Sequence, residues 1–229
     1  MTRVIFLSSI SLPSTLANRQ YVMSMCEGLA QSAAVGLSHD GKIVMYVGHF
    51  YGWKGVDTLV RSATRLGPRV AVFLVGGKAG DVESIRDLIA SVGATNVHLM
   101  PFQPPGRIPQ FLKAADVLVL PNTSGSENSV YYTSPLKLFQ YMAAGKPIVA
   151  SDLPSLRQVL GPENALLVRP DDPEALAQGI QRVLNEHEEA ARRAKLAQEQ
   201  VREHTWEKRA RRVLEFASTG PLTRAPSAV

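Results

Sequence analysis

The feature that most constrains this chain is a regular alternation of short apolar runs with amphipathic helical stripes, which begins near residue 42. The apolar runs predict strands at residues 43–47, 70–75, 97–100, 117–120, 148–150 and 165–168. The stripes between and after them predict helices around residues 56–63, 85–89, 108–112, 138–142 and 176–184. Strands that alternate with helices form a parallel sheet with helices on both faces, so we expect an α/β fold. Ligands of such sheets bind at the carboxyl ends of the strands.

The residues before this alternation predict one further strand and one further helix. Residues 4–7 form an apolar run, and Val22, Met25, Cys26 and Leu29 recur at helical spacing. A short signal peptide is the alternative for the first residues. No apolar run approaches the ~20 residues that span a bilayer. One cysteine offers no disulfide within the chain, and we therefore expect a cytoplasmic protein.

The basic excess of the chain lies late in the sequence. The formal net charge is +5, and Lys and Arg concentrate at residues 191–195 and 207–212, with glutamates nearby. This pattern is typical of a solvated helix face. A weak peripheral contact with an anionic membrane surface is the alternative. Nucleic-acid binding is not expected, because no aromatic residues are interleaved with the basic ones to stack on bases.

A glycine-containing loop follows the first strand of the alternation and opens its first helix, with the sequence GHFYGWKG at residues 48–55. Backbone amides in such a loop can approach an anion, and the start of a helix favours negative charge. Lys54 adds a full positive charge. On spacing alone, an ordinary exposed lysine beside a turn is the alternative.

A second segment, residues 131–145, has the sequence YYTSPLKLFQYMAAG. Ser134 suits the N-cap of a helix and Pro135 suits its first position, which leaves the following amides free to bind phosphate. A well-capped core helix without a ligand is the alternative. The sequence shows no metal-ligand spacing and no convincing nucleophile or general base.

Three segments together carry a family resemblance: GHFYGWKG at 48–55, ADVLVLP at 115–121 and SPLKLFQYMAAGKPIVASD at 134–152. They closely resemble the donor-binding domain of retaining glycosyltransferases with the GT-B fold, of the family 4 (glycosyl transferases group 1) type. The resemblance covers about residues 42–184. It resumes at 205–210, where TWEKRA resembles the family's final helix, which crosses back to the N-terminal domain. It implies a Rossmann-like domain that binds a nucleotide sugar such as a UDP- or GDP-hexose, with no cofactor and no metal ion.

The resemblance also implies roles for individual residues. Lys54 matches the lysine of a positive pair that holds the donor diphosphate, and His49 occupies the partner's position, where arginine is frequent. The phosphates are expected over Ser134, Pro135, Leu136 and Lys137. Phe102 and Gln103 match the loop that usually holds the base.

Two acidic positions of the family differ in this chain. The family carries two glutamates separated by seven residues, of which the first contacts the donor sugar and the second the ribose hydroxyls. Tyr132 and Gln140 stand at these positions, and Glu127 in a nearby longer loop could replace the first. A carboxylate accepts hydrogen bonds from both ribose hydroxyls, whereas an amide offers one acceptor and one donor side, a loss of about 1–3 kcal/mol.

The resemblance divides the chain into four parts. We expect a remnant of the N-terminal acceptor domain at 1–38, a nucleotide-sugar-binding Rossmann-like domain at 39–200, a C-terminal crossing helix at 201–217 and a loose tail at 218–229. Most of the acceptor domain is then absent, which indicates a truncated enzyme. We further expect the final helix, with Trp206, Ala210, Val213 and Leu214 on one face, to pack on residues 1–33 of the same or a neighbouring chain.

The implied activity is transfer of a hexose from a nucleotide sugar, with retention, to an acceptor that the sequence does not identify. One domain provides only one wall of the catalytic cleft, so the enzyme is expected to be impaired or to depend on a homodimer. The first alternative is a non-catalytic module that binds a nucleotide or nucleotide sugar. The second is a sugar-nucleotide epimerase of similar architecture.

Overall fold

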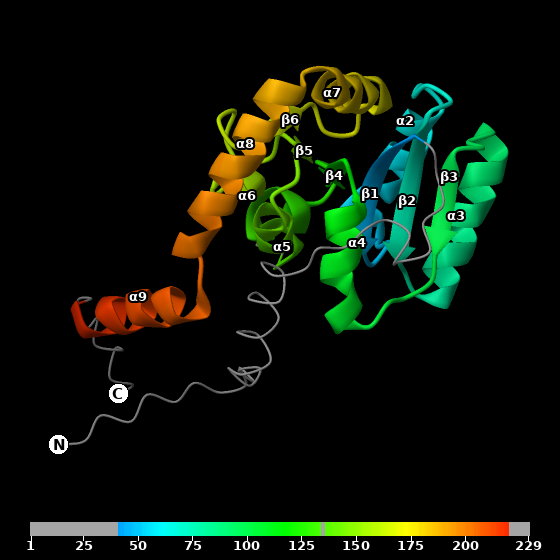
Figure 1. Cartoon of the computed structure of the whole chain (residues 1–229). Helices are drawn as coiled ribbons and strands as arrows, with labels where there is room; N and C mark the ends of the chain where they lie inside the picture. The colour runs from blue at the N-terminus through cyan, green and yellow to red at the C-terminus, as the bar shows by residue number, and fades with distance from the viewer. Residues whose placement is uncertain (1–40, 134–135, 220–229) are drawn as a thin grey trace, which may run out of the picture.

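Six parallel strands form one sheet in the computed structural model, which describes residues 41–133 and 136–219 (Figure 1). The strands are β1 (Lys42–Gly48), β2 (Val70–Gly76), β3 (Val97–Met100), β4 (Val117–Leu120), β5 (Ile148–Ser151) and β6 (Leu166–Val168). Their order is β3-β2-β1-β4-β5-β6, and every neighbouring pair is parallel. The predicted α/β fold with a Rossmann-like parallel sheet is therefore confirmed.

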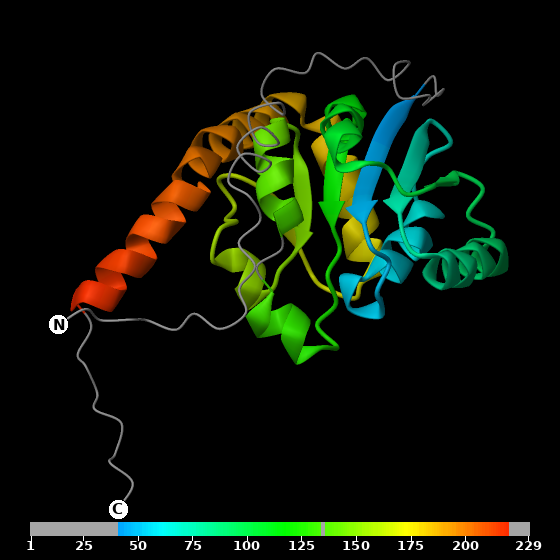
Figure 2. The same cartoon turned by 90° about the horizontal axis from the view of Figure 1, so that it is seen from below.

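Helices cover both faces of this sheet (Figure 2). The longer helices are α2 (Val56–Ala63), α3 (Ala79–Val92), α4 (Ile108–Ala114), α5 (Leu136–Ala144), α7 (Pro173–Asn185) and α8 (His187–Gln200). One core layer joins α4 and α5 to the sheet, and the other joins α2, α3 and α7. Helix α8 contributes Ala197 to the first layer and Ala190 to the second, so it joins the two layers and contacts both α5 and α7.

The residues of β1 show why these elements form. Met45 and Val47 belong to one core layer, and Val44 and Tyr46 belong to the other. A strand that is buried on both faces must be apolar along its whole length, as this one is. Each fully buried side chain of this kind contributes about 1.5–3 kcal/mol.

The strand order reverses between β1 and β4. The chain runs outward through β1, β2 and β3 and then returns to place β4 on the other side of β1. The helices that follow β1 and β4, α2 and α5, therefore lie on opposite faces of the sheet. Open α/β sheets bind their ligands in the crevice at such a reversal point.

Short helical segments were missing from the sequence-based prediction. They are α6 (Pro154–Arg157), a π-helix η4 (Asn128–Tyr132) and single 3₁₀ turns η2 (Gly52–Lys54), η3 (Pro105–Arg107) and η5 (Val201–Glu203). Asp172 caps the start of α7, because its carboxylate accepts hydrogen bonds from the amides of Glu174 and Ala175.

The last helix, α9 (Trp206–Thr219), projects away from the sheet (Figures 1 and 2). It begins at Trp206, later than the predicted residue 201, because η5 precedes it. Val213 on this helix is 55% exposed and Leu214 is 69% exposed, and the expected packing on residues 1–33 of the same or a neighbouring chain stays a prediction. The strand and helix predicted within residues 1–33 lie outside the described residues, as do Ser134, Pro135 and the tail from residue 220. Within the described ranges, no helix has the length and apolar character needed to cross a bilayer.

Candidate anion-binding site

The loop from β1 to α2 lies in direct backbone contact with the loop that leaves β4. Gly55 ends η2 with a left-handed φ of 64° and forms the N-cap of α2. A Cβ atom at this position would lie 1.9 Å from the carbonyl oxygen of Pro121, so only glycine fits. The same two loops also share a hydrogen bond, which the Thr123 amide donates to the Trp53 carbonyl oxygen over 3.4 Å. The strand reversal thus brings two loops together at one point.

Lys54 lies in this contact region with its side chain largely removed from water. The residue is 8% exposed, and its ammonium lies 3.4 Å from the centroid of the Trp53 ring. Burial lowers the pKa of Lys54 to about 8. No carboxylate of the described residues forms an ion pair with it. A poorly solvated cation without a carboxylate partner favours an anionic ligand.

A second lysine, Lys137, reaches the same region from the first turn of α5. Its Nζ atom donates a hydrogen bond to the Tyr46 hydroxyl over 2.5 Å. Burial, and secondarily the nearby charge of Lys54, lowers the pKa of Lys137 well below its ordinary value. Lys137 likewise has no carboxylate ion-pair partner among the residues that the structure describes. The structure therefore places two unneutralised cations close enough to disfavour each other's charge.

The starts of two helices add to the positive character of this edge. Helix α2 begins at Val56, directly after the loop that carries Lys54, and α5 begins at Leu136, one residue before Lys137. The first amides of a helix lack intrahelical acceptors and favour negative charge nearby. The arrangement is suited to a multiply charged anion such as a diphosphate.

The other predicted site residues that the structure describes lie in loops and short helical turns that follow β1, β3 and β4, and on α5. The His49 side chain is exposed and stacks on Tyr51, with ring centroids 5.0 Å apart. Gln140 is half-buried on α5, three residues beyond Lys137 and thus on a neighbouring part of the same helix face. Leu136, Phe102 and Tyr132 are 61%, 67% and 75% exposed, and Glu127 is also exposed. The Nε2 atom of Gln103 donates a hydrogen bond to the Pro101 carbonyl oxygen.

Three residues of this region were not predicted from the sequence. Tyr46 appeared only as a strand residue, yet its hydroxyl contacts Lys137. Asn122, directly after Pro121, is 1% exposed, and neither polar atom of its side chain finds a hydrogen-bond partner among the described residues. The same holds for the Ser129 hydroxyl in η4. A buried polar group without a hydrogen-bond partner destabilises the folded state by about 1–3 kcal/mol. Each such group therefore requires an explanation, and a role in ligand binding is one.

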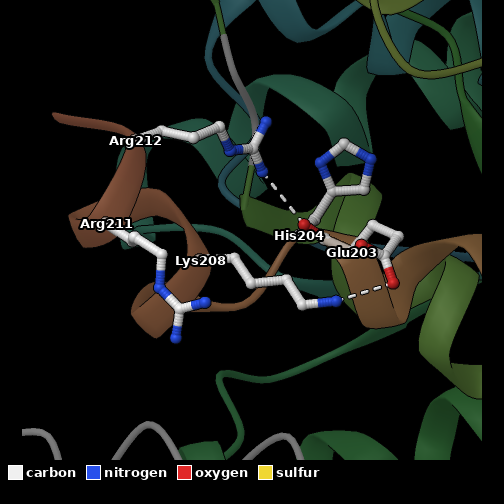
Figure 3. Close-up of a pocket in the computed structure, with 5 residues that line it drawn as sticks. All are labelled: Glu203, His204, Lys208, Arg211 and Arg212. Carbon is white, nitrogen blue, oxygen red and sulfur yellow. Dashed lines mark hydrogen bonds and ion pairs between the residues drawn. The ribbon is translucent and has the colours of Figure 1, made fainter. Parts of the chain in front are cut away.

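The described part of the chain offers no metal centre, because no three His, Cys, Asp or Glu side chains gather there. A separate cavity of about 280 Å³ lies where η5 meets α9 and is lined by Glu203, His204, Lys208, Arg211 and Arg212 (Figure 3). Its charges are partly satisfied internally: Lys208 pairs with the Glu203 carboxylate at 2.6 Å, and Arg212 donates to the Glu203 carbonyl oxygen. Its lining includes neither Lys54 nor Lys137, although His204 contacts Phe139 of α5, with ring centroids 5.1 Å apart.

Comparison with known proteins agrees with this architecture. A family model described as "Glycosyl transferases group 1" matches residues 30–200. An uncharacterized glycosyltransferase of Methanocaldococcus jannaschii is 30% identical over 156 residues, which are 67% of this chain and 38% of the relative. The sucrose-phosphate synthase from Thermosynechococcus elongatus has a similar structure, with a TM-score of 0.70 and 28% identity over 82% of this chain and 47% of that one.

A third similar structure is the HepE protein of Anabaena, which was solved in complex with UDP-glucose. Its TM-score is 0.69 at 20% identity, and the match covers 86% of this chain and 52% of HepE. At this identity the likeness concerns the fold. The chain spans about two fifths to one half of the length of these three proteins.

Proposed function

Because the chain belongs to the glycosyl transferases group 1 family, we propose that it binds a nucleotide-sugar donor and serves transfer of the donor's hexose, with retention, to an acceptor alcohol. Residues 39–200 form the donor-binding domain in this proposal. The observation that carries it is the pair of desolvated lysines, Lys54 and Lys137, at the point where the strand order reverses.

The two lysines serve the leaving group. Negative charge grows on the nucleoside diphosphate as its bond to the sugar breaks. Lys54, Lys137 and the first amides of α2 and α5 stabilise this charge, and they do so best because they are fixed in place and shielded from water. No metal ion is required, since the cations of the protein perform the neutralisation.

In a nucleotide sugar the ribose with its base and the donor sugar are attached to opposite ends of the diphosphate. We assign the ribose to Gln140, which follows Lys137 by three residues on α5. Phe102 and Gln103, in the loop that follows β3, hold the base. The donor sugar contacts Tyr132 and Glu127, while His49 assists Lys54 at the diphosphate. The solved complex of HepE with UDP-glucose supports a UDP-type donor.

The acceptor side of the reaction lies beyond the donor domain. The chain spans at most about half of the similar proteins described above. We propose that residues 1–38 derive from the acceptor domain and that α9 is the crossing helix. A second copy of the chain could supply the other wall of the cleft, because transfer requires both substrates in a site that excludes water.

A non-catalytic binding module is the second candidate function. The observation that favours it is Gln140, because an amide replaces the carboxylate that grips the ribose in related enzymes. A module of this kind binds nucleotide or nucleotide sugar without turnover.

Titration calorimetry with UDP, GDP, UDP-glucose and pyrophosphate tests the donor site directly. We expect binding of pyrophosphate and of at least one nucleotide, and loss of both in Lys54→Ala. A transfer and hydrolysis assay with the ligand that binds then separates enzyme from module. Absence of binding at millimolar concentrations of all four ligands would refute both candidate functions.

A further inference from the structure

Tyr46 occupies an unusual position for a tyrosine in the middle layer of the fold. It lies on β1, its side chain is fully buried, and it is among the largest such side chains described. Its ring belongs to the core layer formed with α2, α3 and α7. Its hydroxyl nevertheless reaches the carboxyl edge of the sheet, two residues beyond Tyr46 itself, where Gly48 ends the strand.

The hydroxyl joins two segments of the anion site through a directional chain of hydrogen bonds. It donates to the carbonyl oxygen of His49 over 2.7 Å. Since its only proton is used there, it accepts the hydrogen bond from Lys137 Nζ over 2.5 Å. The same ammonium lies 3.9 Å from the centroid of the Tyr46 ring, so the ring face and the hydroxyl both hold it.

Gly48 leaves room for this contact. A Cβ atom on Gly48 would lie 2.6 Å from Lys137 Nζ and 3.1 Å from its Cε. The lysine tip therefore occupies the space that a side chain at position 48 would fill. Tyr46 below and Gly48 beside it hold the ammonium in one place, and among the described residues only the Tyr46 hydroxyl accepts a hydrogen bond from it.

We propose that Tyr46 is a positioning residue of the anion site: its hydroxyl and ring hold the ammonium of Lys137 where it contacts the bound phosphate groups. This inference rests on the proposed donor site and assigns to Tyr46 a role that acts through Lys137. Preorganisation of this kind raises affinity because the cation does not have to be ordered when the anion arrives.

The protein contains a matched control in Tyr141 on α5. Tyr141 is also fully buried, and its hydroxyl accepts one hydrogen bond from the Val47 amide over 2.8 Å. Tyr46→Phe and Tyr141→Phe each remove one buried hydroxyl and keep the ring. Only the first removes an acceptor from Lys137.

The experiment is a double-mutant cycle on binding of UDP and pyrophosphate, with thermal unfolding measured for every variant. We expect Tyr46→Phe to weaken binding of both ligands about tenfold, and Lys137→Ala to weaken it about 10- to 100-fold. In the Lys137→Ala background, Tyr46→Phe should change affinity less than twofold. Tyr141→Phe should leave affinity unchanged in both backgrounds. A tenfold effect of Tyr46→Phe that persists without Lys137 would overturn the proposal.

A ligand-free measurement separates this inference from the proposed function. We expect acetic anhydride to label Lys137 faster in Tyr46→Phe than in the wild type or Tyr141→Phe, as quantified by mass spectrometry. Equal labelling rates in all three proteins would overturn the positioning role even where nucleotide binds. Faster labelling together with absent binding of every nucleotide would instead uphold the positioning role and refute the donor site.

Discussion

The ammonium of Lys54 lies 3.4 Å from the centroid of the Trp53 ring, and both residues belong to the single turn η2 between β1 and α2. The electrostatic environment of the indole therefore depends on the charge of the Lys54 ammonium. An anion that binds Lys54 partly neutralises the ammonium above the ring, and so changes the charge that the indole faces. The indole is thus a built-in probe of the proposed diphosphate site.

We predict that UDP or pyrophosphate changes the fluorescence of Trp53. The chain has two tryptophans, and the other, Trp206, lies at the start of α9. The measurement uses Trp206→Phe, in which only Trp53 emits. We expect saturable change with the dissociation constant found by calorimetry. The control is Trp53→Phe, where Trp206 should not respond, and a response there would place the anion elsewhere.

We predict that affinity for UDP falls as pH rises through about 8. Burial lowers the pKa of Lys54 to about 8, and the bound anion favours the charged amine. Below this pH the lysine is already protonated, whereas above it binding must take up a proton, at a cost that grows to about tenfold per pH unit. Lys137, whose pKa is also lowered by burial, adds to the same trend.

Calorimetry in buffers of different ionisation enthalpy measures this proton uptake. Lys54→Arg is the control, because arginine stays charged throughout this range. The uptake near pH 8 should disappear in that variant, while any contribution of Lys137 remains. Identical pH profiles for wild type and Lys54→Arg would contradict the assignment to Lys54.

We predict that Lys54→Met abolishes anion binding and raises the stability of the ligand-free protein by about 1–2 kcal/mol at pH 7. The folded-state pKa is lowered, so between about 8 and the ordinary lysine value the unfolded chain binds the proton and the folded chain does not. Wild-type stability therefore rises with pH through this window, and the variant lacks this gain. Denaturant unfolding from pH 6.5 to 9.5 should show the two curves converging as pH rises.

We predict that Gln140→Glu raises affinity for UDP about 5- to 100-fold and leaves affinity for pyrophosphate unchanged. A carboxylate accepts hydrogen bonds from both ribose hydroxyls, whereas pyrophosphate has no ribose. The measurement is calorimetry with both ligands on wild type and variant. An equal gain for pyrophosphate would show that position 140 acts on the phosphates instead.

We predict that the chain self-associates through α9. Val213, Leu214 and Phe216 are 55%, 69% and 77% exposed, an apolar surface that favours association. Val213→Lys combined with Leu214→Lys should shift sedimentation toward the monomer without lowering the melting temperature. Ser218→Lys, also on exposed α9, controls for the addition of a lysine to this helix. Unchanged sedimentation in the double variant would show that α9 does not mediate association.

Much of the sheet follows from local sequence. The predicted strand at 117–120 coincides with β4, because a strand buried on both faces gives an uninterrupted apolar run. The predicted strand at 97–100 coincides with β3, although β3 lies at the sheet edge and is only partly buried. By contrast, η4 and α6 lack such a signal. They are joined by a hydrogen bond from the Ser155 hydroxyl to the Ser129 carbonyl oxygen, 26 positions apart, which no local pattern predicts.

The candidate site divides in the same way. The sequence predicted Lys54 and Lys137 as phosphate ligands, and the structure brings the two together while the ligand itself stays a prediction. The contact from Lys137 to Tyr46 spans 91 positions and depends on the strand order. The unpartnered amide of Asn122 likewise becomes visible only after burial is known. The sequence pattern predicts which residues lie at the carboxyl edge of the sheet, whereas tertiary packing determines which of them contact one another.

In the turn that joins β1 to α2, substitutions at the adjacent positions Lys54 and Gly55 should differ in their effects on folding and on ligand binding. At Gly55, any side chain meets the backbone of the neighbouring loop, so a mutational library sorted for folded protein and one sorted for ligand capture would both lose every substitution. At Lys54, removal of the buried charge helps folding and removes the ligand's counter-charge. Replacements there should be enriched in the first library and depleted in the second. A difference map between two such libraries would therefore outline the binding surface without any bound structure.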